Sequence, residues 1–181
     1  MYSEDLDIKI AGDKPSKDIK LNRRQAEEFS ISKSDLEKAK LLGKKVANSF
    51  INDANHFSVG EEVDDYSMII QRRLLLSFTT TVGFEQYCPN DTICGIAQKS
   101  FLDTLKKNDS ELYNTSSDTG AFSFYYLAFR RGSEIDRRIG QTFAMLCAHD
   151  GDPVYQELGE ALYCWFLSVV RKAVKELEFG K

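Results

Sequence analysis

A chain of 181 residues with 42% hydrophobic and 12% aromatic side chains can bury the core of one domain, and its length disfavours two. The net charge of −4 gives no general attraction to nucleic acid or anionic lipid, so a nucleic-acid binder would need a local basic patch. No apolar stretch approaches the roughly 20 residues of a membrane helix, and the opening MYSEDLDIKI is acidic where an export signal would be basic. We therefore expect a cytoplasmic protein with reduced cysteines.

Residues 1–30 are expected to form a flexible arm. Their few apolar side chains are scattered among charges of both signs, and Gly12 and Pro15 interrupt any period. Such a segment buries too little apolar surface to offset the entropy lost on ordering. Its apolar residues could still dock on the body or on a partner as a short strand or turn. The remaining residues, 31–181, are assigned to one domain.

Two long helices are predicted next, each begun by a capping box. The first starts at Ser34, and its apolar residues recur every three or four positions as far as Phe57. The second starts at Ser58 and runs to about Tyr87. Its middle, LLLSFTTTVGF, is apolar nearly all round and rich in residues that favour strands, so a strand over 74–84 is the alternative.

Two shorter helices are expected in the middle of the chain. The first runs from about Ile93 to Asn108, and the polar stretch NDSELYNTSSDTG after it is expected to be a loop with at most one helical turn. The second runs from Phe122 to Arg131, because its aromatic residues are spaced i, i+3, i+4 and i+7. The same segment, FSFYYLAF over 122–129, could also form a strand.

Two further helices complete the chain. Ser133 is expected to cap the first, which ends at Gly151. The second has Asp152 at its N-cap and Pro153 in its first turn, where the missing amide proton of proline costs nothing. Six helices joined mostly by short turns predict an all-α fold, a single-domain bundle with a flexible N-terminal arm.

An adjacent pair, His149 and Asp150, is typical of metal-dependent phosphohydrolase sites. Such a site needs at least one more histidine and a further aspartate, and the other histidine of the chain, His56, lies at the far end of another predicted helix. The pair also stands where one helix ends and the next begins, so we interpret both residues as capping residues. No metal site and no cofactor are expected.

The four cysteines are interpreted as buried and inert. Cys94 falls in the first turn of a predicted helix, where partial positive charge favours the thiolate. Five residues separate it from Cys88, however, which is not the spacing of CxxC redox or zinc pairs. Cys147 and Cys164 are placed on core-facing stripes. A redox or zinc role is the alternative.

An anion site is the best candidate for specific chemistry. Arginine pairs bracket a turn in the run RRGSEIDRR, next to a predicted helix start that could hold a phosphate or carboxylate. Tyrosine hydroxyls from the preceding aromatic helix would suit the edge of a groove. The candidate residues are Arg130, Arg131, Arg137, Arg138, Tyr125 and Tyr126. The alternatives are that Glu134 and Asp136 neutralise the arginines and that the tyrosines belong to the core.

No catalytic motif is found: there is no glycine-rich phosphate loop, no GxSxG, no HExxH and no Glu-x-x-His pair. The leading hypothesis is a non-enzymatic helical interaction or regulatory protein, which binds a protein partner or associates with itself. The alternative is a helical protein, which could be an enzyme, that binds a small molecule, phosphate or carboxylate through residues 130–138. No membrane partner is expected, and nucleic-acid binding through the arginine pairs is the weakest hypothesis.

Overall fold

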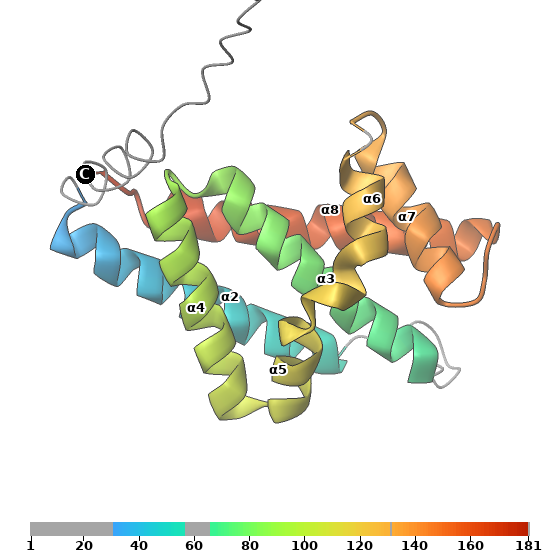
Figure 1. Ribbon diagram of the computed structural model, residues 1–181, viewed down its shortest axis with the longest axis horizontal. Coiled ribbons are helices and arrows are strands. Elements are labelled where there is room, and N and C mark those ends of the chain that lie inside the picture. Colours follow the sequence, from blue (N-terminus) through green and yellow to red (C-terminus); the bar gives the residue numbers. More distant parts are fainter. Residues whose placement is uncertain (1–30, 57–65, 131, 181) are drawn as a thin grey trace, which may run out of the picture. The chain divides into compact units, whose positions relative to one another are not determined.

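The computed structural model describes residues 31–56, 66–130 and 132–180, and these ranges contain helices and turns but no strand (Figure 1). The helices are α2 (Lys33–His56), α3 (Tyr66–Tyr87), α4 (Asp91–Asn108), α5 (Ser110–Ser117), the 3-10 turn η1 (Thr119–Phe122), α6 (Ser123–Arg130), α7 (Ile135–Leu146) and α8 (Pro153–Glu176). The predicted all-α fold is confirmed, and both segments for which a strand was the alternative, 74–84 and 122–129, are helical. The expected arm over residues 1–30 and the expected cap at Ser58 lie outside the described residues.

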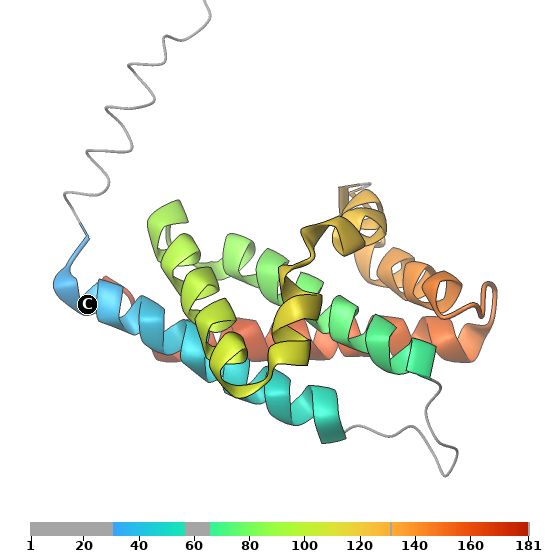
Figure 2. The same ribbon diagram turned by 60° about the horizontal axis from the view of Figure 1, so that its bottom comes forward.

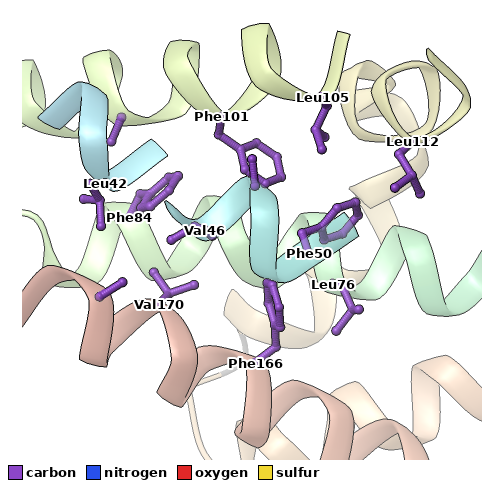
Figure 3. Packing of buried hydrophobic residues seen from close by; sticks show 13 residues of the cluster. Leu42, Val46, Phe50, Leu76, Phe84, Phe101, Leu105, Leu112, Phe166 and Val170 are labelled. Carbon is purple, nitrogen blue, oxygen red and sulfur yellow. The ribbon is translucent and has the colours of Figure 1, made fainter. Parts of the chain in front are cut away.

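The described helices enclose two clusters of buried apolar side chains. One lies among α2, α4, α5 and parts of α3 and α8, and includes Phe50 and Phe101 (Figure 3). The other lies among α6, α7 and other parts of α3 and α8, and includes Phe78 and Phe143. Helices α3 and α8 contribute to both clusters and run side by side (Figure 1 and Figure 2). These two helices therefore join the halves of the core.

Helix α3 is covered on all sides in its middle. Every residue from Leu74 to Thr80 is buried, which accounts for the absence of an amphipathic period in this segment. The hydroxyls of Thr79 and Thr80 donate to backbone carbonyls one turn earlier, at 2.7 and 2.9 Å. A buried hydroxyl without such a partner would cost about 1–3 kcal/mol. The helix thus supplies its own acceptors, and residues that favour strands are accommodated in it.

Helix α5 was not predicted, because its segment was expected to be a loop. Asp109 caps it and accepts hydrogen bonds from two amides of the first turn, at 3.1 and 3.0 Å. The helix is fastened to α3 by a buried hydrogen bond between Ser77 and Ser116 at 2.7 Å, and by an ion pair of Arg73 with Glu111 at 2.7 Å. A helix of eight residues is stabilised mainly by such tertiary contacts, which a polar sequence does not reveal.

Two of the predicted capping residues were wrong. Helix α2 begins at Lys33, and Ser32, two residues before the expected cap at Ser34, caps it by accepting the Asp35 amide at 3.0 Å. At the start of α7 the cap position is Glu134 rather than Ser133, and its side chain makes no capping hydrogen bond. Glu134 has a φ of 50°, in the left-handed region. The chain therefore enters this helix through a left-handed turn, which no capping residue in the sequence indicates.

The turn between α7 and α8 is longer than predicted, because α7 ends early, whereas the predicted start of α8 is confirmed. Helix α7 ends at Leu146 instead of Gly151. Ala148 has a φ of 62° and Gly151 a φ of 80°, and both left-handed residues turn the chain before α8 begins. The predicted N-cap is confirmed, because the Asp152 carboxylate accepts the Val154 amide at 2.9 Å.

Glycines allow helices α7 and α8 to lie backbone to backbone. A Cβ added to Gly140 would collide with the carbonyl oxygen of Gln156 and lie 3.1 Å from the amide nitrogen of Glu160. On the other helix, a Cβ added to Gly159 would lie 2.6 Å from the Cβ of Phe143. The two helices can therefore approach this closely only because each has a glycine, without a side chain, at the contact.

We expect Gly140→Ala to lower the free energy of unfolding by about 1–3 kcal/mol, because the backbone of α8 must move to admit the methyl group. Gly95→Ala is the matched control, since nothing lies within 4 Å of a Cβ added to this residue of α4. It should be neutral or stabilising by up to about 1 kcal/mol, as alanine favours a helix more than glycine does. Urea unfolding followed by circular dichroism measures both, and equal effects would contradict the close approach.

The first half of α2 is tied to the end of α8 and to the residues that follow it. The contacts are the Gly180 amide to the Asp35 carboxylate at 3.1 Å, the Lys38 ammonium to the Glu178 carbonyl at 2.8 Å, and the ion pair of Lys45 with Glu176. The hydrogen bond from the Gly180 amide, helped by that from Ser32, lowers the pKa of Asp35 below its usual value. These contacts hold the ionised form of Asp35 in the folded protein.

We expect the Gly180–Asp35 contact to weaken in acid. A carboxylate with a lowered folded-state pKa stabilises the fold above its unfolded pKa, and this contribution is lost as the pH falls through the folded value. Asp35→Asn should therefore melt below the wild type at pH 7, and the difference should vanish as the pH is lowered past the titration of Asp35. Asp150→Asn, in the exposed α7–α8 turn, is the control for the loss of one carboxylate. A constant difference between wild type and Asp35→Asn down to pH 2 would contradict this linkage.

Candidate functional site

The structure gives the predicted arginines mostly local contacts. Arg130, the last residue of α6, lies over the ring of Tyr126, with 5.9 Å between its guanidinium carbon and the ring centroid. Arg137 is exposed and forms an ion pair with Glu134 at 3.7 Å, as the alternative interpretation expected. Arg138 is half-buried and donates to the Ser133 hydroxyl at 3.4 Å. The fourth residue, Arg131, lies outside the described part of the chain, so an anion site here stays a prediction.

The two predicted tyrosines occupy different environments. Tyr125 is completely buried and stacks on Phe78, with 5.4 Å between ring centroids, instead of presenting its hydroxyl at the edge of a groove. That hydroxyl has no hydrogen-bond partner among the described residues, and burial raises its pKa well above the usual value. Tyr126 is half-buried and meets Phe78 edge-on at 5.1 Å. The aromatic block of α6 therefore belongs mainly to the core.

A groove that the sequence did not predict lies between α2 and α4, and we call it the lysine groove. It has a volume of about 1280 Å³. On α2 it is lined by Lys33, Leu36, Glu37, Lys40, Lys44 and Asn48. On α4 it is lined by Ile96, Lys99, Ser100, Asp103, Thr104, Lys106, Lys107 and Asn108.

Close contact between α2 and α4 fixes the two walls of the lysine groove. A Cβ added to Gly43 would collide with the Ala97 carbonyl oxygen and lie 2.7 Å from the amide nitrogen of Phe101. Beside this contact the Ser100 hydroxyl donates to the Lys40 carbonyl at 2.7 Å. The two helices can be followed as they cross in Figure 1 and Figure 2. The separation of the two walls is thus set by backbones in direct contact.

The apolar sides of the same two helices determine where the lysines point. Val46 and Phe50 from α2 meet Phe101 and Leu105 from α4 in the buried cluster shown in Figure 3. Phe50 and Phe101 pack edge to face at 5.6 Å. Because these faces are buried, the lysines on the other faces of α2 and α4 are directed outward, where they line the groove.

The lysine groove is strongly basic on a chain whose net charge is −4. Six lysines and two carboxylates line it. Glu37 accepts a hydrogen bond from Lys40 at 2.8 Å, and this bond lowers the pKa of Glu37 below its usual value. Among the described residues, Lys44, Lys99 and Lys107 form no ion pair. The groove therefore holds positive charge that its own carboxylates do not neutralise.

Apolar atoms form part of the groove lining as well. Leu36 and Ile96 are both half-buried and line it from opposite helices. The alkyl stems of lysine side chains extend such a surface, because the charged ends remain in water while the stems cover apolar atoms. The groove can thus contact both an apolar surface and negative charges at its edges.

The spacing of lysines on α2 is the signal that could have indicated the groove. Lys33, Glu37, Lys40 and Lys44 follow one another at intervals of three and four, which places them on one face. A charged face of a helix is usually only a solvated surface, and nothing in the sequence shows that α4 lies beside it. The crossing at Gly43 brings the two faces together, and it could be seen only in the structure.

Other kinds of site are not found in the described residues. No group of three or more histidine, cysteine, aspartate or glutamate side chains in these ranges could hold a metal ion. His149 instead stacks on Tyr155, with 3.7 Å between ring centroids. None of the described helices has the length and apolar character needed to cross a membrane. Comparisons of the chain with protein-family models, curated proteins and solved structures found no match.

Proposed function

We propose that this is a non-enzymatic helical interaction protein, and that its lysine groove binds an acidic amphipathic helix of a partner protein. The observation that carries the proposal is the groove itself, in which lysines from α2 and α4 flank the half-buried apolar residues Leu36 and Ile96. A partner helix with apolar residues on one face and carboxylates beside them matches this arrangement. The lysines would contribute specificity and the rate of association as well as affinity.

The dimensions of the lysine groove suit a short helix. Its lining residues on α2 extend from Lys33 to Asn48, which corresponds to about 22 Å along a helix axis. Those on α4 extend from Ile96 to Asn108, or about 18 Å. An acidic helix of three to four turns covers this distance. The groove is also bordered by two helices whose backbones are already in contact, so binding requires little ordering of the protein.

The composition of the lysine groove favours a protein partner over nucleic acid. No arginine and no aromatic residue line it, whereas stacking on aromatic rings and arginine contacts are prominent in nucleic-acid binding. Glu37 and Asp103 within it would repel a continuous phosphate backbone. A protein helix can place its carboxylates at intervals that avoid these two side chains. Nucleic-acid binding is therefore an outcome that the experiment must be able to detect.

We expect Lys44→Glu combined with Lys99→Glu to weaken binding of a labelled 15-residue helical peptide by about tenfold or more. The peptide carries leucines on one face and glutamates on both sides of them. Each reversed charge is worth about 1 kcal/mol at an exposed site, and 1.4 kcal/mol corresponds to tenfold. Fluorescence anisotropy measures the affinity, which should also fall as salt is added.

The matched control combines Lys172→Glu with Lys175→Glu, which changes the net charge equally but affects two exposed lysines of α8 outside the groove. It should leave the affinity within about twofold of the wild type, because distant exposed charges are screened by salt. Equal weakening by both double variants would overturn the proposal, and so would no detectable binding by the wild type. Tighter binding of a single-stranded oligonucleotide than of the peptide would also overturn it.

A second change should strengthen the same interaction. Glu37→Gln removes a carboxylate from the lysine groove and leaves Lys40 without its hydrogen-bonded counter-ion. We expect the acidic peptide to bind about two- to fivefold more tightly, since a repulsive charge is lost and a lysine is released. Glu157→Gln, an exposed residue of α8, is the control for the change in net charge. Unchanged or weaker binding by Glu37→Gln would show that the peptide does not occupy this part of the groove.

A further inference from the structure

The outward face of the first half of α8 carries a stripe of exposed apolar side chains. Val154, Ala161 and Trp165 are all exposed, and their intervals of seven and four residues place them in one row along the helix. The exposed fractions of Val154 and Trp165 are 66% and 40%. Apolar residues exposed singly are normal, whereas an aligned row of them is typical of a surface that meets a partner.

A cysteine lies beside this stripe. Cys164 directly precedes Trp165 and is exposed, which contradicts the prediction that it lies on a core-facing stripe. Helix α8 has apolar residues on more than one face, and the sequence does not show which of these faces packs inside. Cys147 is buried as predicted, and Cys88 and Cys94 are half-buried.

The stripe lies in a segment with many carboxylates. Residues 139–170 contain Asp150, Asp152, Glu157 and Glu160 but no lysine or arginine. Glu157 is exposed, and so is Asp150 in the turn before the helix. Asp150, Glu157 and Glu160 form no ion pair with any described residue. The first half of α8 is thus an acidic amphipathic helix whose negative charge is not neutralised nearby.

This face has the properties that the lysine groove requires of a partner. The stripe from Val154 to Trp165 extends about 17 Å along the helix axis. The two walls of the groove extend about 22 and 18 Å, so the lengths agree. Both surfaces combine apolar atoms with charge, and the charges have opposite signs. The structure therefore contains the two halves of one complementary contact.

One copy of the chain cannot make this contact with itself. The first half of α8 is held against α7, where the backbones meet at Gly140. The end of α8 instead meets α2, which forms one wall of the groove, through the ion pair of Lys45 with Glu176. From Val154 to Glu176 the helix axis extends about 33 Å. In Figure 1 the first turns of α8 accordingly lie beside α7, away from the start of α2.

We propose that the lysine groove of one copy binds the first half of α8 of a second copy, so that the chain associates with itself head to tail. This inference rests on the proposed function and identifies the partner helix. The apolar stripe of α8 lies against Leu36 and Ile96, and the carboxylates beside it face the lysines. Because the two surfaces differ, the assembly closes when the contact is made twice in a two-fold dimer or repeated around a ring.

Complementary charge reversals test this contact. The groove variant is Lys44→Glu with Lys99→Glu, and the helix variant is Asp150→Lys with Glu157→Lys. Sedimentation velocity over about 1–300 μM should show that the wild type associates as its concentration rises. Each variant alone should associate about tenfold or more weakly, because like charges then meet. An equimolar mixture of the two should regain association, since each reversed surface finds a complementary one.

The control variant Lys172→Glu with Lys175→Glu has the same net charge as the groove variant and changes lysines outside the groove. It should associate like the wild type, and circular dichroism checks that every variant is folded. A wild type that stays monomeric over the whole range would overturn the inference. A mixture that associates no better than its two components would overturn it as well.

The acidic helical peptide separates this inference from the proposed function. Excess peptide should dissociate the wild-type assembly, because both occupy the same groove. Peptide binding by a wild type that never associates would leave the proposed function standing and rule out only the second copy. Failure of both peptide binding and association would overturn both. Glu157 lies on the inserted helix, so Glu157→Gln does not alter the groove that receives the peptide in dilute, monomeric protein.

Cys164 allows the contact to be located directly. A short cross-linker that joins a thiol to an amine should connect Cys164 of one copy to Lys44 or Lys99 of another. Mixing chains that contain light and heavy nitrogen identifies links between copies by mass spectrometry, and Cys164→Ser removes the reacting thiol. Links from Cys164 only within one chain, or only to lysines outside the groove such as Lys172, would contradict the proposed contact.

Discussion

The complete burial of the middle of α3, residues 74–80, is the constraint on which the rest of the described fold depends. A helix without a solvent-facing side in its middle must be covered from several directions, so α2, α5, α7 and α8 all lie against it. The three polar side chains of this buried middle are acceptable because each finds a partner: Thr79 and Thr80 within the helix, and Ser77 on α5. The short helix α5 is thus part of what α3 requires, because it supplies the acceptor or donor for Ser77.

This arrangement places apolar and charged side chains on different faces of the same helices. The sides of α2 and α4 that turn toward α3 and α8 carry the aromatic and aliphatic residues of one cluster. The sides that remain carry lysines, and the crossing at Gly43 aligns them into two walls. The basic lysine groove therefore arises from packing, although the chain as a whole is acidic.

Features encoded by neighbouring residues could be predicted from the sequence, whereas features created by distant contacts could not. The cap at Asp152 and the helical aromatic spacing that starts at Phe122 are local, and both were confirmed. Helix α5 was missed because its stability comes from α3, and the start of α7 because a left-handed Glu134 takes the place of a capping side chain. Tyr125 was a candidate for the edge of an anion site because its hydroxyl is polar, but the structure buries its ring against Phe78, as the alternative of core packing expected. The lysine groove required knowing which two helices meet.

Gly43 has a consequence beyond allowing two helices to touch. The separation between the lysine rows is set by how closely the backbones of α2 and α4 approach. This close approach is possible because Gly43 has no Cβ. The absence of a single methyl group thus determines the width of the groove. A larger residue at this position would push the rows apart without altering one charge. Under the proposed function, the diameter of the partner helix that fits between the rows would therefore depend on Gly43, a residue of the helix contact that does not itself line the groove.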